Sequence, residues 1–253
     1  EIAQDDTNLY IADVNNYRIK VLNKTDLSLI AVFGTLGTGV TSYHVATGID
    51  VDDRYIYIGD EGNSSLKKVS KSSYTVLQVQ PLNINTVADI SVRVDENFVY
   101  DCFNTQSEQN YNYQDVVLEK RFKDSLKLVS KTILRPQNAP LYQSTYTIQG
   151  DISLSGDYIY VTFTDDQNRN GSWYIQKLLK SDFSIVREFK SSQSNSTVVA
   201  EGLSYKPKKK TQFQDLNAEG SYLQLKYSES DLDNSFRLYS QGFLVQNEGV
   251  LEH

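Results

Sequence analysis

Residues 8–21 read NLYIADVNNYRIKV, and residues 55–68 read YIYIGDEGNSSLKK. The second stretch repeats the pattern of the first at a displacement of 47 residues, with no gap in the register. The matched positions include Tyr10 and Tyr57, Asp13 and Asp60, and Asn16 and Asn63. A fixed period of this length is typical of repeat architectures, in which each copy forms one supersecondary unit.

The pattern recurs along the rest of the chain. Tyr158-Ile-Tyr160 repeats Tyr55-Ile-Tyr57, the third copy carries extra residues in one loop, and the fifth copy, which starts at Glu201, is the weakest. The repeats are predicted at residues 1–47, 48–87, 88–148, 149–199 and 200–250. The last three residues, Leu-Glu-His at 251–253, are interpreted as the remnant of a purification tag.

Each copy alternates apolar and polar residues over short stretches, which is the period of a β-strand. About four such strands per copy, separated by Asp, Asn, Ser and Gly, are typical of a β-propeller blade. We therefore predict an all-β, five-bladed β-propeller of four-stranded antiparallel blades, forming a single domain over residues 1–250. Two alternatives stay open: a six-bladed propeller with an extra blade in the long third copy, and a β-sandwich, which does not account for the gapless register.

The repeat also resembles a known family. Residues 8–21, followed by Val32-Phe-Gly34 and by Thr47-Gly-Ile-Asp-Val-Asp52, resemble the NHL-type propeller repeat, which couples a YVAD…N.RI hairpin to an FG turn and a GIAVD inner strand. The resemblance is good over residues 1–80 and partial over residues 146–190. It implies the propeller fold. It implies no single activity, because such propellers include protein-binding platforms, carbohydrate or RNA binders, lactonases and lyases.

Composition excludes several classes of protein. The chain has 253 residues, of which 39% are apolar, and a formal net charge of −7. This is the composition of a folded domain, and the negative charge argues against a nucleic-acid partner. The one cysteine, Cys102, cannot form an internal disulfide, and with His44 as the one histidine before the terminal Leu-Glu-His there is no Cys/His set for structural zinc.

The setting of the protein is predicted from what the sequence lacks. No apolar run approaches the roughly 20 residues of a spanning helix, so no membrane insertion is expected. The first twenty residues carry Asp5, Asp6 and Asp13 and do not read as a signal peptide. We expect an extracellular, cell-surface or virion location, with the chain belonging to a larger polypeptide or assembly.

In a propeller blade whose strands run outward from the centre, the loops after the second and fourth strands share one face around the mouth of the central channel. We call this the mouth face. Its loops are the longest, at residues 34–47, 104–115, 134–150 and 164–172, and ligand sites concentrate on long loops.

The mouth-face loops carry aromatic rings and planar amides, which suit a sugar ring or a protein hot spot. The predicted ligand-binding residues are Tyr43, His44, Tyr111, Tyr113, Tyr142, Tyr146, Arg169 and Trp173. The function that we predict is non-catalytic binding of a carbohydrate or a partner protein, without a cofactor.

An enzymatic alternative stays open. Glu201-Gly-Leu203 resembles the opening of an inner strand in gluconolactonase-like propellers, where the glutamate is a metal ligand, and His44 is an imidazole available as acid or base. This hydrolase or lyase would use Glu201, His44, Asp89 and Asp151, with Glu201, Asp89 and Asp165 around calcium or another divalent ion. The equivalent ligand positions hold Thr47, Asp89 and Gly150, so the set is incomplete. A glycosidase could draw its carboxylates from Asp50, Asp89, Asp151 and Glu201.

Other polar positions are predicted to be structural. Asp13 and Asp60 each precede an asparagine by three residues, an arrangement that suits a turn in which a carboxylate accepts backbone N–H groups. On the face opposite the mouth, short polar segments such as residues 52–53 and 71–73 are predicted to be simple turns.

Overall fold

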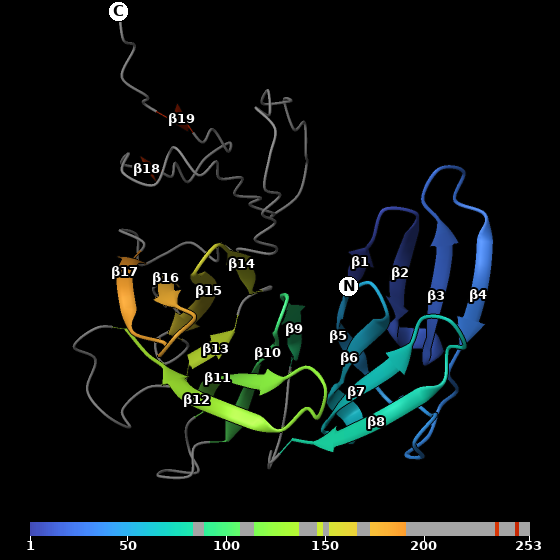
Figure 1. Cartoon of the computed structure of the whole chain (residues 1–253). Coiled ribbons are helices and arrows are strands. Elements are labelled where there is room, and N and C mark those ends of the chain that lie inside the picture. Colours follow the sequence, from blue (N-terminus) through green and yellow to red (C-terminus); the bar gives the residue numbers. More distant parts are fainter. Residues whose placement is uncertain are drawn as a thin grey trace, which may run out of the picture. The chain divides into compact units, whose positions relative to one another are not determined.

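The computed structural model describes residues 1–82, 89–106, 114–136, 146–148, 152–165, 173–190, 236–237 and 246–247. The chain divides into two compact units, Glu1–Ile148 and Gln149–His253. Apart from two 3-10 helices of three residues each, the regular structure in the described ranges is antiparallel β-sheet (Figure 1). The all-β prediction is confirmed.

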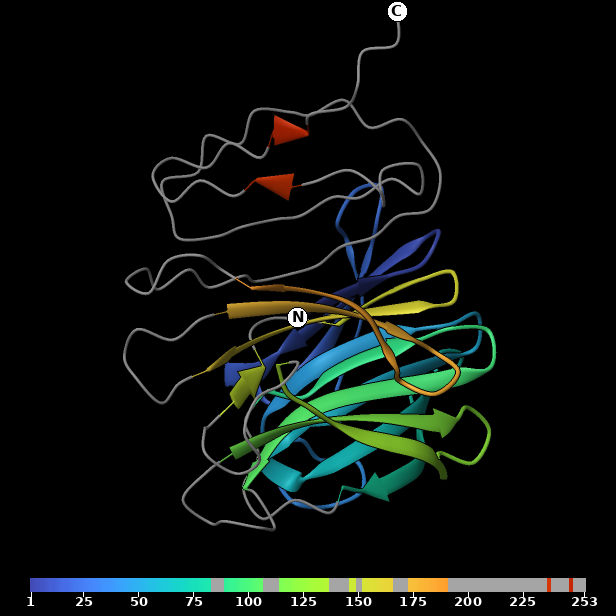
Figure 2. The same cartoon turned by 90° about the vertical axis from the view of Figure 1, so that its left-hand side faces the viewer.

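The first unit contains three four-stranded sheets, each formed by strands that are consecutive in the chain (Figure 2). Blade 1 comprises β1 (Ile2–Gln4), β2 (Asn8–Asp13), η1 (Val14–Asn16), β3 (Arg18–Asn23) and β4 (Leu29–Phe33). Blade 2 comprises β5 (Ala46–Val51), β6 (Tyr55–Asp60), η2 (Glu61–Asn63), β7 (Ser65–Ser70) and β8 (Val76–Pro81). Blade 3 comprises β9 (Ser91–Val94), β10 (Phe98–Gln106), β11 (Gln114–Phe122) and β12 (Leu128–Leu134), and β13 (Tyr146–Ile148) follows it.

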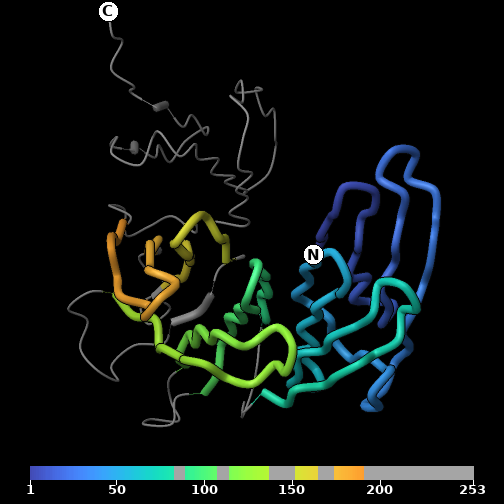
Figure 3. Tube along the Cα trace, viewed as in Figure 1, coloured from blue at the N-terminus to red at the C-terminus, as the bar shows by residue number. Residues whose placement is uncertain are grey.

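The second unit repeats the same order of strands, which can be followed along the Cα trace in Figure 3. Its antiparallel pairs join β14 (Ser153–Ser155) to β15 (Tyr158–Asp165), β15 to β16 (Trp173–Leu179) and β16 to β17 (Ile185–Lys190). β18 (Phe236–Arg237) pairs with β19 (Gln246–Asn247). The first four predicted copies each contain one such set of strands, although β5 begins at Ala46, before the predicted copy boundary at residue 48. The remainder of the fifth copy lies outside the described residues.

The blades pack because alternate residues of each strand share a face. Tyr10 and Ala12 of β2 and Ile19 and Val21 of β3 are buried on the face of blade 1 that meets blade 2. From blade 2, this core receives Ile49, Ile56, Ile58 and Val69. A second core, between blades 2 and 3, contains Tyr57, Leu66, Val92, Val99, Phe103 and Val117.

One turn recurs between the first two strands of all three blades. Asp5 Oδ1 accepts the N–H groups of Thr7 and Asn8 at 2.9 and 2.7 Å, and Asp5 Oδ2 accepts the hydroxyl of Tyr10 at 2.8 Å. The same bond joins the Asp and Tyr of the next two blades, at 3.0 Å for Asp52 with Tyr57 and 3.1 Å for Asp95 with Tyr100. The sequence period therefore marks a structural contact as well as a strand.

This contact gives a first prediction. Replacing Tyr57 with phenylalanine removes one hydrogen bond to a charged acceptor and keeps the ring, so the free energy of unfolding should fall by about 1.5–3 kcal/mol. Urea unfolding at neutral pH measures the change. Tyr55→Phe, on the neighbouring aromatic ring, is the matched control and should have little effect, because no hydrogen bond of the Tyr55 hydroxyl supports the turn. Equal losses in both variants would contradict the assigned role of the bond.

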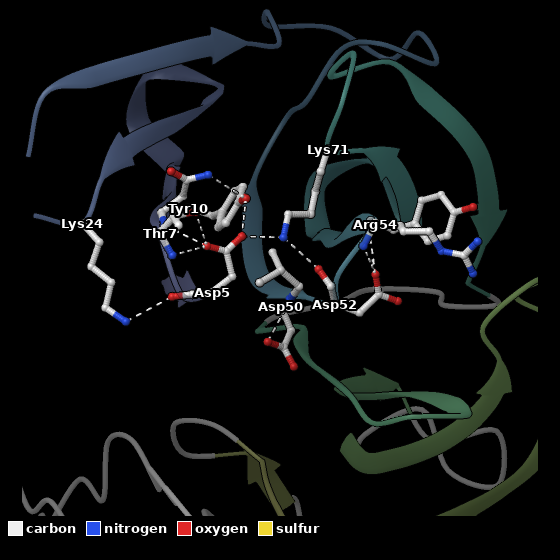
Figure 4. A network of polar contacts seen from close by, with 11 residues as sticks. Asp5, Thr7, Tyr10, Lys24, Asp50, Asp52, Arg54 and Lys71 are labelled. Atoms are coloured by element: carbon white, nitrogen blue, oxygen red, sulfur yellow. Dashed lines mark hydrogen bonds and ion pairs between the residues drawn. The ribbon is translucent and has the colours of Figure 1, made fainter.

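The same turns also connect the blades to one another, as Figure 4 shows for Asp5 and Lys71. Lys71 Nζ of blade 2 bonds to Asp5 Oδ2 of blade 1 and, at 2.9 Å, to the carbonyl oxygen of Asp52 in its own blade. Lys123 of blade 3 lies 2.8 Å from Asp52 Oδ2 of blade 2. Burial raises the pKa of Asp5, but the hydrogen bonds from Lys71, Thr7, Tyr10 and Asn8 outweigh it and hold the pKa well below its usual value. These segments are turns, as predicted, and they also join neighbouring blades.

A second recurring turn joins the third and fourth strands. Its last residue has a positive φ in each described blade, although it is never glycine: 60° at Leu27, 54° at Tyr74, 51° at Leu126 and 62° at Phe183. Large side chains rarely adopt this conformation, so surrounding structure must hold them there. In blade 2, Tyr74 stacks on Phe33 of blade 1 with ring centroids 5.3 Å apart. In blade 3, Leu126 is fully buried in the core shared with blade 2.

Blade 3 contains a buried charged cluster. Asp101, Glu119 and Arg121 stand at the repeat positions that hold Ile58, Lys67 and Val69 in blade 2. They project from the same sheet face as Val99 and Phe103, which pack on blade 2. Arg121 Nε lies 2.8 Å from Asp101 Oδ1, and Arg121 Nη2 bonds to Glu119 Oε2. Asp101 Oδ2 is buried without a hydrogen-bond partner.

Candidate functional site

The long connection between blades 1 and 2 forms an exposed loop, Thr35–His44, which we call the rim loop. It lies beside η2 and beside Tyr17, the residue that follows η1. The loop after a blade's second strand and the crossing into the next blade therefore lie together, as predicted for the mouth face.

A buried polar group holds the rim loop in place. Lys67 Nζ bonds to Asp60 Oδ2 at 2.8 Å and to the carbonyl oxygen of Ser42, and both charged side chains are almost completely buried. Asp60 Oδ1 accepts the N–H groups of His44 and Val45 at 3.0 and 3.1 Å. Asn63 Nδ2 donates to Asp60 Oδ2 at 2.7 Å and to the carbonyl oxygen of Gly37 at 3.0 Å. The structural role predicted for Asp60 is confirmed.

We call Asp60, Asn63 and Lys67 the anchor. Blade 1 has the same three residue types at Asp13, Asn16 and Lys20, bonded in the same way to one another, but there they are far more exposed. The side chain of Lys20 is 34% exposed, whereas that of Lys67 is 2% exposed. The anchor in blade 2 is thus the buried form of a sequence motif that also occurs, more exposed, in blade 1.

Anchoring lets the rim loop expose apolar and aromatic groups in a fixed conformation. Leu36 and Val40 are 58% and 60% exposed. Gly34, with a φ of 96°, starts the loop against the ring of Tyr43. The rim loop therefore combines a rigid base with exposed side chains that water solvates poorly.

His44 ends the rim loop and is exposed. Its ring stacks on Tyr17 with centroids 6.4 Å apart and an interplanar angle of 20°, and its Nδ1 lies 3.4 Å from the carbonyl oxygen of Gly62. A side chain at Gly62 would collide with the imidazole, so glycine at this position leaves room for it. The two stacked rings offer a flat edge on which a ligand can pack.

Asp89, from the crossing into blade 3, lies beside a residue that the sequence analysis did not select. Its backbone N–H donates to Glu61 Oε2 at 3.1 Å. Desolvation raises the pKa of both carboxyl groups, and the charge of Asp89 adds to the rise at Glu61. Across the described ranges, no three His, Cys, Asp or Glu side chains come together as metal ligands would.

The inner strands hold another acid. Asp50 of β5 accepts the N–H groups of Val94 and Val51 at 2.7 and 2.9 Å, and burial raises its pKa to about 6 despite the nearby charge of Arg93. Arg93 Nη1 lies 2.6 Å from Glu1 Oε1, and Glu1 Oε2 accepts the N–H of Ile49 at 2.9 Å. Each of these inner-strand carboxylates thus links neighbouring blades.

The predicted ligand-binding residues differ in their exposure to solvent. His44 is exposed beside the rim loop, but Tyr43 is fully buried, because its ring packs against Phe33 and Gly34 and lies 4.5 Å from Lys67 Nζ. Tyr43 is therefore a core residue, and its prediction as a ligand contact is corrected. Tyr146, Asp165 and Trp173 are described as strand backbone alone. Tyr111, Tyr113, Tyr142, Asp151, Arg169 and Glu201 lie outside the described residues.

The described residues include no helix that is long and apolar enough to cross a membrane. Cys102 is buried, as its apolar neighbours predict.

Comparison with known proteins identifies the fold. No protein-family model and no curated protein matches the chain. Hydrazine synthase from Kuenenia stuttgartiensis is similar in structure, with a TM-score of 0.60 and 11% identity over 81% of this chain and 58% of that chain. Quinohemoprotein alcohol dehydrogenase from Comamonas testosteroni is similar with a TM-score of 0.54 and 8% identity over 75% of this chain and 34% of that chain.

Both structures are of the β-propeller type, so the predicted propeller fold is confirmed at that level. The chain spans less than two thirds of either protein's length. At such low identity the likeness shows the fold alone. The resemblance to NHL-type repeats stays a prediction.

Proposed function

We propose that the protein is a non-catalytic binding module and that the rim loop, with Tyr17 and His44, contacts a partner protein on the mouth face. The observation that carries this proposal is the exposure of Leu36 and Val40 on a loop held by the buried anchor. A side chain whose conformation is fixed before the partner arrives loses little entropy on association.

A carbohydrate is the second candidate. The observation that favours it is the stacked pair of Tyr17 and His44, since a sugar ring packs its C–H face on such rings. Tyr111, Tyr113, Tyr142, Tyr146, Arg169 and Trp173 belong to the same proposal as further contacts. Neither candidate requires a cofactor.

The proposal also includes the number of blades, the location of the protein and the outcome expected for an enzyme. We infer five blades in one domain, because the repeat arithmetic assigns residues 200–250 to a fifth copy. We also propose an extracellular or cell-surface location, which suits a module that displays a rigid apolar loop to a partner. The enzymatic alternative would require Glu201, Asp89 and Asp165 to meet around a divalent ion, and Glu201→Gln would then abolish activity without affecting partner binding.

Photo-crosslinking tests the rim loop. Benzoylphenylalanine is introduced at Leu36 or, as a matched control, at Leu77 of β8, which is 56% exposed against 58% for Leu36. In the protein's native surroundings, we expect a discrete covalent adduct from position 36 that is absent from position 77. Val40→Asp should abolish the adduct while leaving the melting temperature unchanged.

Equal adducts from both positions, or an adduct indifferent to Val40→Asp, would contradict the proposed site. If instead a panel of saccharides raises the melting temperature by mass action, and His44→Ala removes the rise, the carbohydrate candidate replaces the protein partner.

A further inference from the structure

Two acidic side chains lie together beside the rim loop. Glu61 is the first residue of η2, and its Oε2 accepts the backbone N–H of Asp89 at 3.1 Å. Glu61 is half-buried, Asp89 is exposed, and neither forms an ion pair with a lysine, arginine or histidine of the described ranges. The mouth face therefore carries two negative charges that the described structure leaves without a counter-ion.

Other carboxylates of the first unit are treated differently. A lysine or arginine lies within ion-pair distance of Glu1, Asp5, Asp13, Asp52, Asp60, Asp101, Asp115 and Glu119. At the mouth face, the charge of Asp89 instead acts against the ionised form of Glu61. A cation that approached this pair would relieve the repulsion, whereas an anion would add to it.

The aromatic pair of Tyr17 and His44 lies next to these carboxylates. Gly62, which follows Glu61 in η2, is so close to the imidazole of His44 that a Cβ at Gly62 would lie 2.3 Å from Nδ1. Aromatic rings attract cations, and a planar guanidinium can stack on a ring while its N–H groups donate to a carboxylate. Arginine fits such a place better than lysine, whose ammonium group cannot stack.

The rim loop continues from the same residues. The backbone N–H of Glu61 donates to the carbonyl oxygen of Val45 at 2.7 Å, and Asn63 of η2 holds Gly37 of the loop. Apolar, aromatic and acidic groups thus occupy adjoining parts of one face. We call them the docking surface: Leu36, Val40, Tyr17, His44, Glu61 and Asp89.

We propose that the docking surface binds a segment of a partner protein in which an apolar side chain stands close in sequence to an arginine. The apolar side chain packs on Leu36 and Val40, and the guanidinium stacks beside Tyr17 and His44 and donates to the two carboxylates. An entirely apolar partner would cover these charges without pairing them, which is costly, and an acidic partner would be repelled. This inference rests on the proposed function and names the chemistry of the partner.

Selection from a peptide library tests the inference. The probe is a library of random nonapeptides with leucine fixed at the central position, selected on the immobilised full chain. We expect arginine to be enriched at positions near the leucine. Glu61→Gln/Asp89→Asn should remove the enrichment and weaken binding of the selected peptides about tenfold or more, because hydrogen bonds to charged acceptors are lost. Glutamine keeps an acceptor for the N–H of residue 89, so the melting temperature should not change.

A second double variant controls for net charge. Asp6→Asn/Asp53→Asn also removes two negative charges, but from exposed positions in the turns opposite the mouth face. It should weaken binding by less than about twofold, because distant surface charges are screened by salt. Citrulline in place of the peptide's arginine keeps the shape and removes the charge. Its loss should match that of Glu61→Gln/Asp89→Asn, and the two losses should not add.

Reversing the charge should reverse the selection. Glu61→Lys/Asp89→Lys is expected to enrich aspartate and glutamate in place of arginine. Failure to enrich basic peptides, an enrichment that survives Glu61→Gln/Asp89→Asn, or equal losses in the two asparagine-containing double variants would each overturn the inference. The rim-loop proposal is judged separately by the adduct from position 36. An adduct that forms in equal yield with Glu61→Gln/Asp89→Asn would keep the rim loop as a contact and refute the arginine-bearing partner.

Discussion

Replacing Lys67 with methionine should lower the free energy of unfolding by about 3–5 kcal/mol, the range measured when one partner of a buried ion pair is removed. The variant leaves Asp60 buried without its cation and frees the carbonyl oxygen of Ser42. Methionine fills a similar volume, so the loss reports charge and hydrogen bonding more than packing. Urea unfolding at neutral pH measures it.

Lys20→Met is the internal control for this experiment, because Lys20 makes the same contact with Asp13 in blade 1, 2.8 Å long but partly exposed. Exposed ion pairs contribute roughly 0–1 kcal/mol. Similar losses in the two variants would mean that burial of the anchor is not what stabilises the rim loop. A Lys67→Met protein that keeps full stability and full rim crosslinking would refute the anchor outright.

The second large effect is expected in blade 3. Arg121→Met removes the guanidinium that lies between Asp101 and Glu119 and leaves both buried carboxyl groups without their hydrogen-bond donor, so we expect a loss of about 3–5 kcal/mol. The triple variant Asp101→Ile, Glu119→Met, Arg121→Leu removes all three charged groups of the cluster and places apolar side chains in their positions. It should be as stable as the original protein or more so, because no charge then remains buried.

The same cluster should make stability depend on pH. Burial raises the pKa of Asp101 well above its usual value, and the charge of Glu119 adds to the rise, although Arg121 opposes it. The folded protein therefore holds a proton that the unfolded chain releases near pH 4, so this part of the stability is full below about pH 4 and is lost as the pH rises through the raised pKa. Unfolding free energies at about pH 5 and pH 9 should differ less in Asp101→Asn than in the original protein. An unchanged difference would show that Asp101 is not the group that titrates.

Much of the fold could be predicted from the sequence because the residues that repeat every 47 positions are the ones that form the recurring contacts. The register that matches Asp13 with Asp60 and Asn16 with Asn63 also matches the hydrogen bonds of those residues. The alternation in β2 marks its buried face for the same reason, whereas β6 is buried on both faces. The contacts between Lys71 and Asp5 could not be predicted, because a turn residue and its partner in the preceding blade lie 66 positions apart and neither has a local signature.

The candidate site was predicted less completely. His44 was selected for its chemistry, and its exposure agrees with that choice. Tyr43, its neighbour, was selected by the same reasoning but is buried, because its ring packs against Phe33 and Gly34. Leu36 and Val40 were missed, since an apolar residue in a loop has the same sequence signal whether it is covered or exposed. The signal that could have identified them is the anchor, whose lysine and aspartate recur in both blades.

The lysine contacts between blades all run in the same direction along the chain, from the later blade to the earlier one. Blades 2 and 3 each donate a lysine to an aspartate of the blade before them, so in blade 2 the two sides are complementary rather than alike. Head-to-tail contacts of this kind can repeat without limit. They form a closed ring when the last unit contacts the first, and an open filament when it does not. A substitution at Asp52 should therefore weaken the contact of blade 2 with the blade after it and leave its contact with the blade before it, made by Lys71, in place.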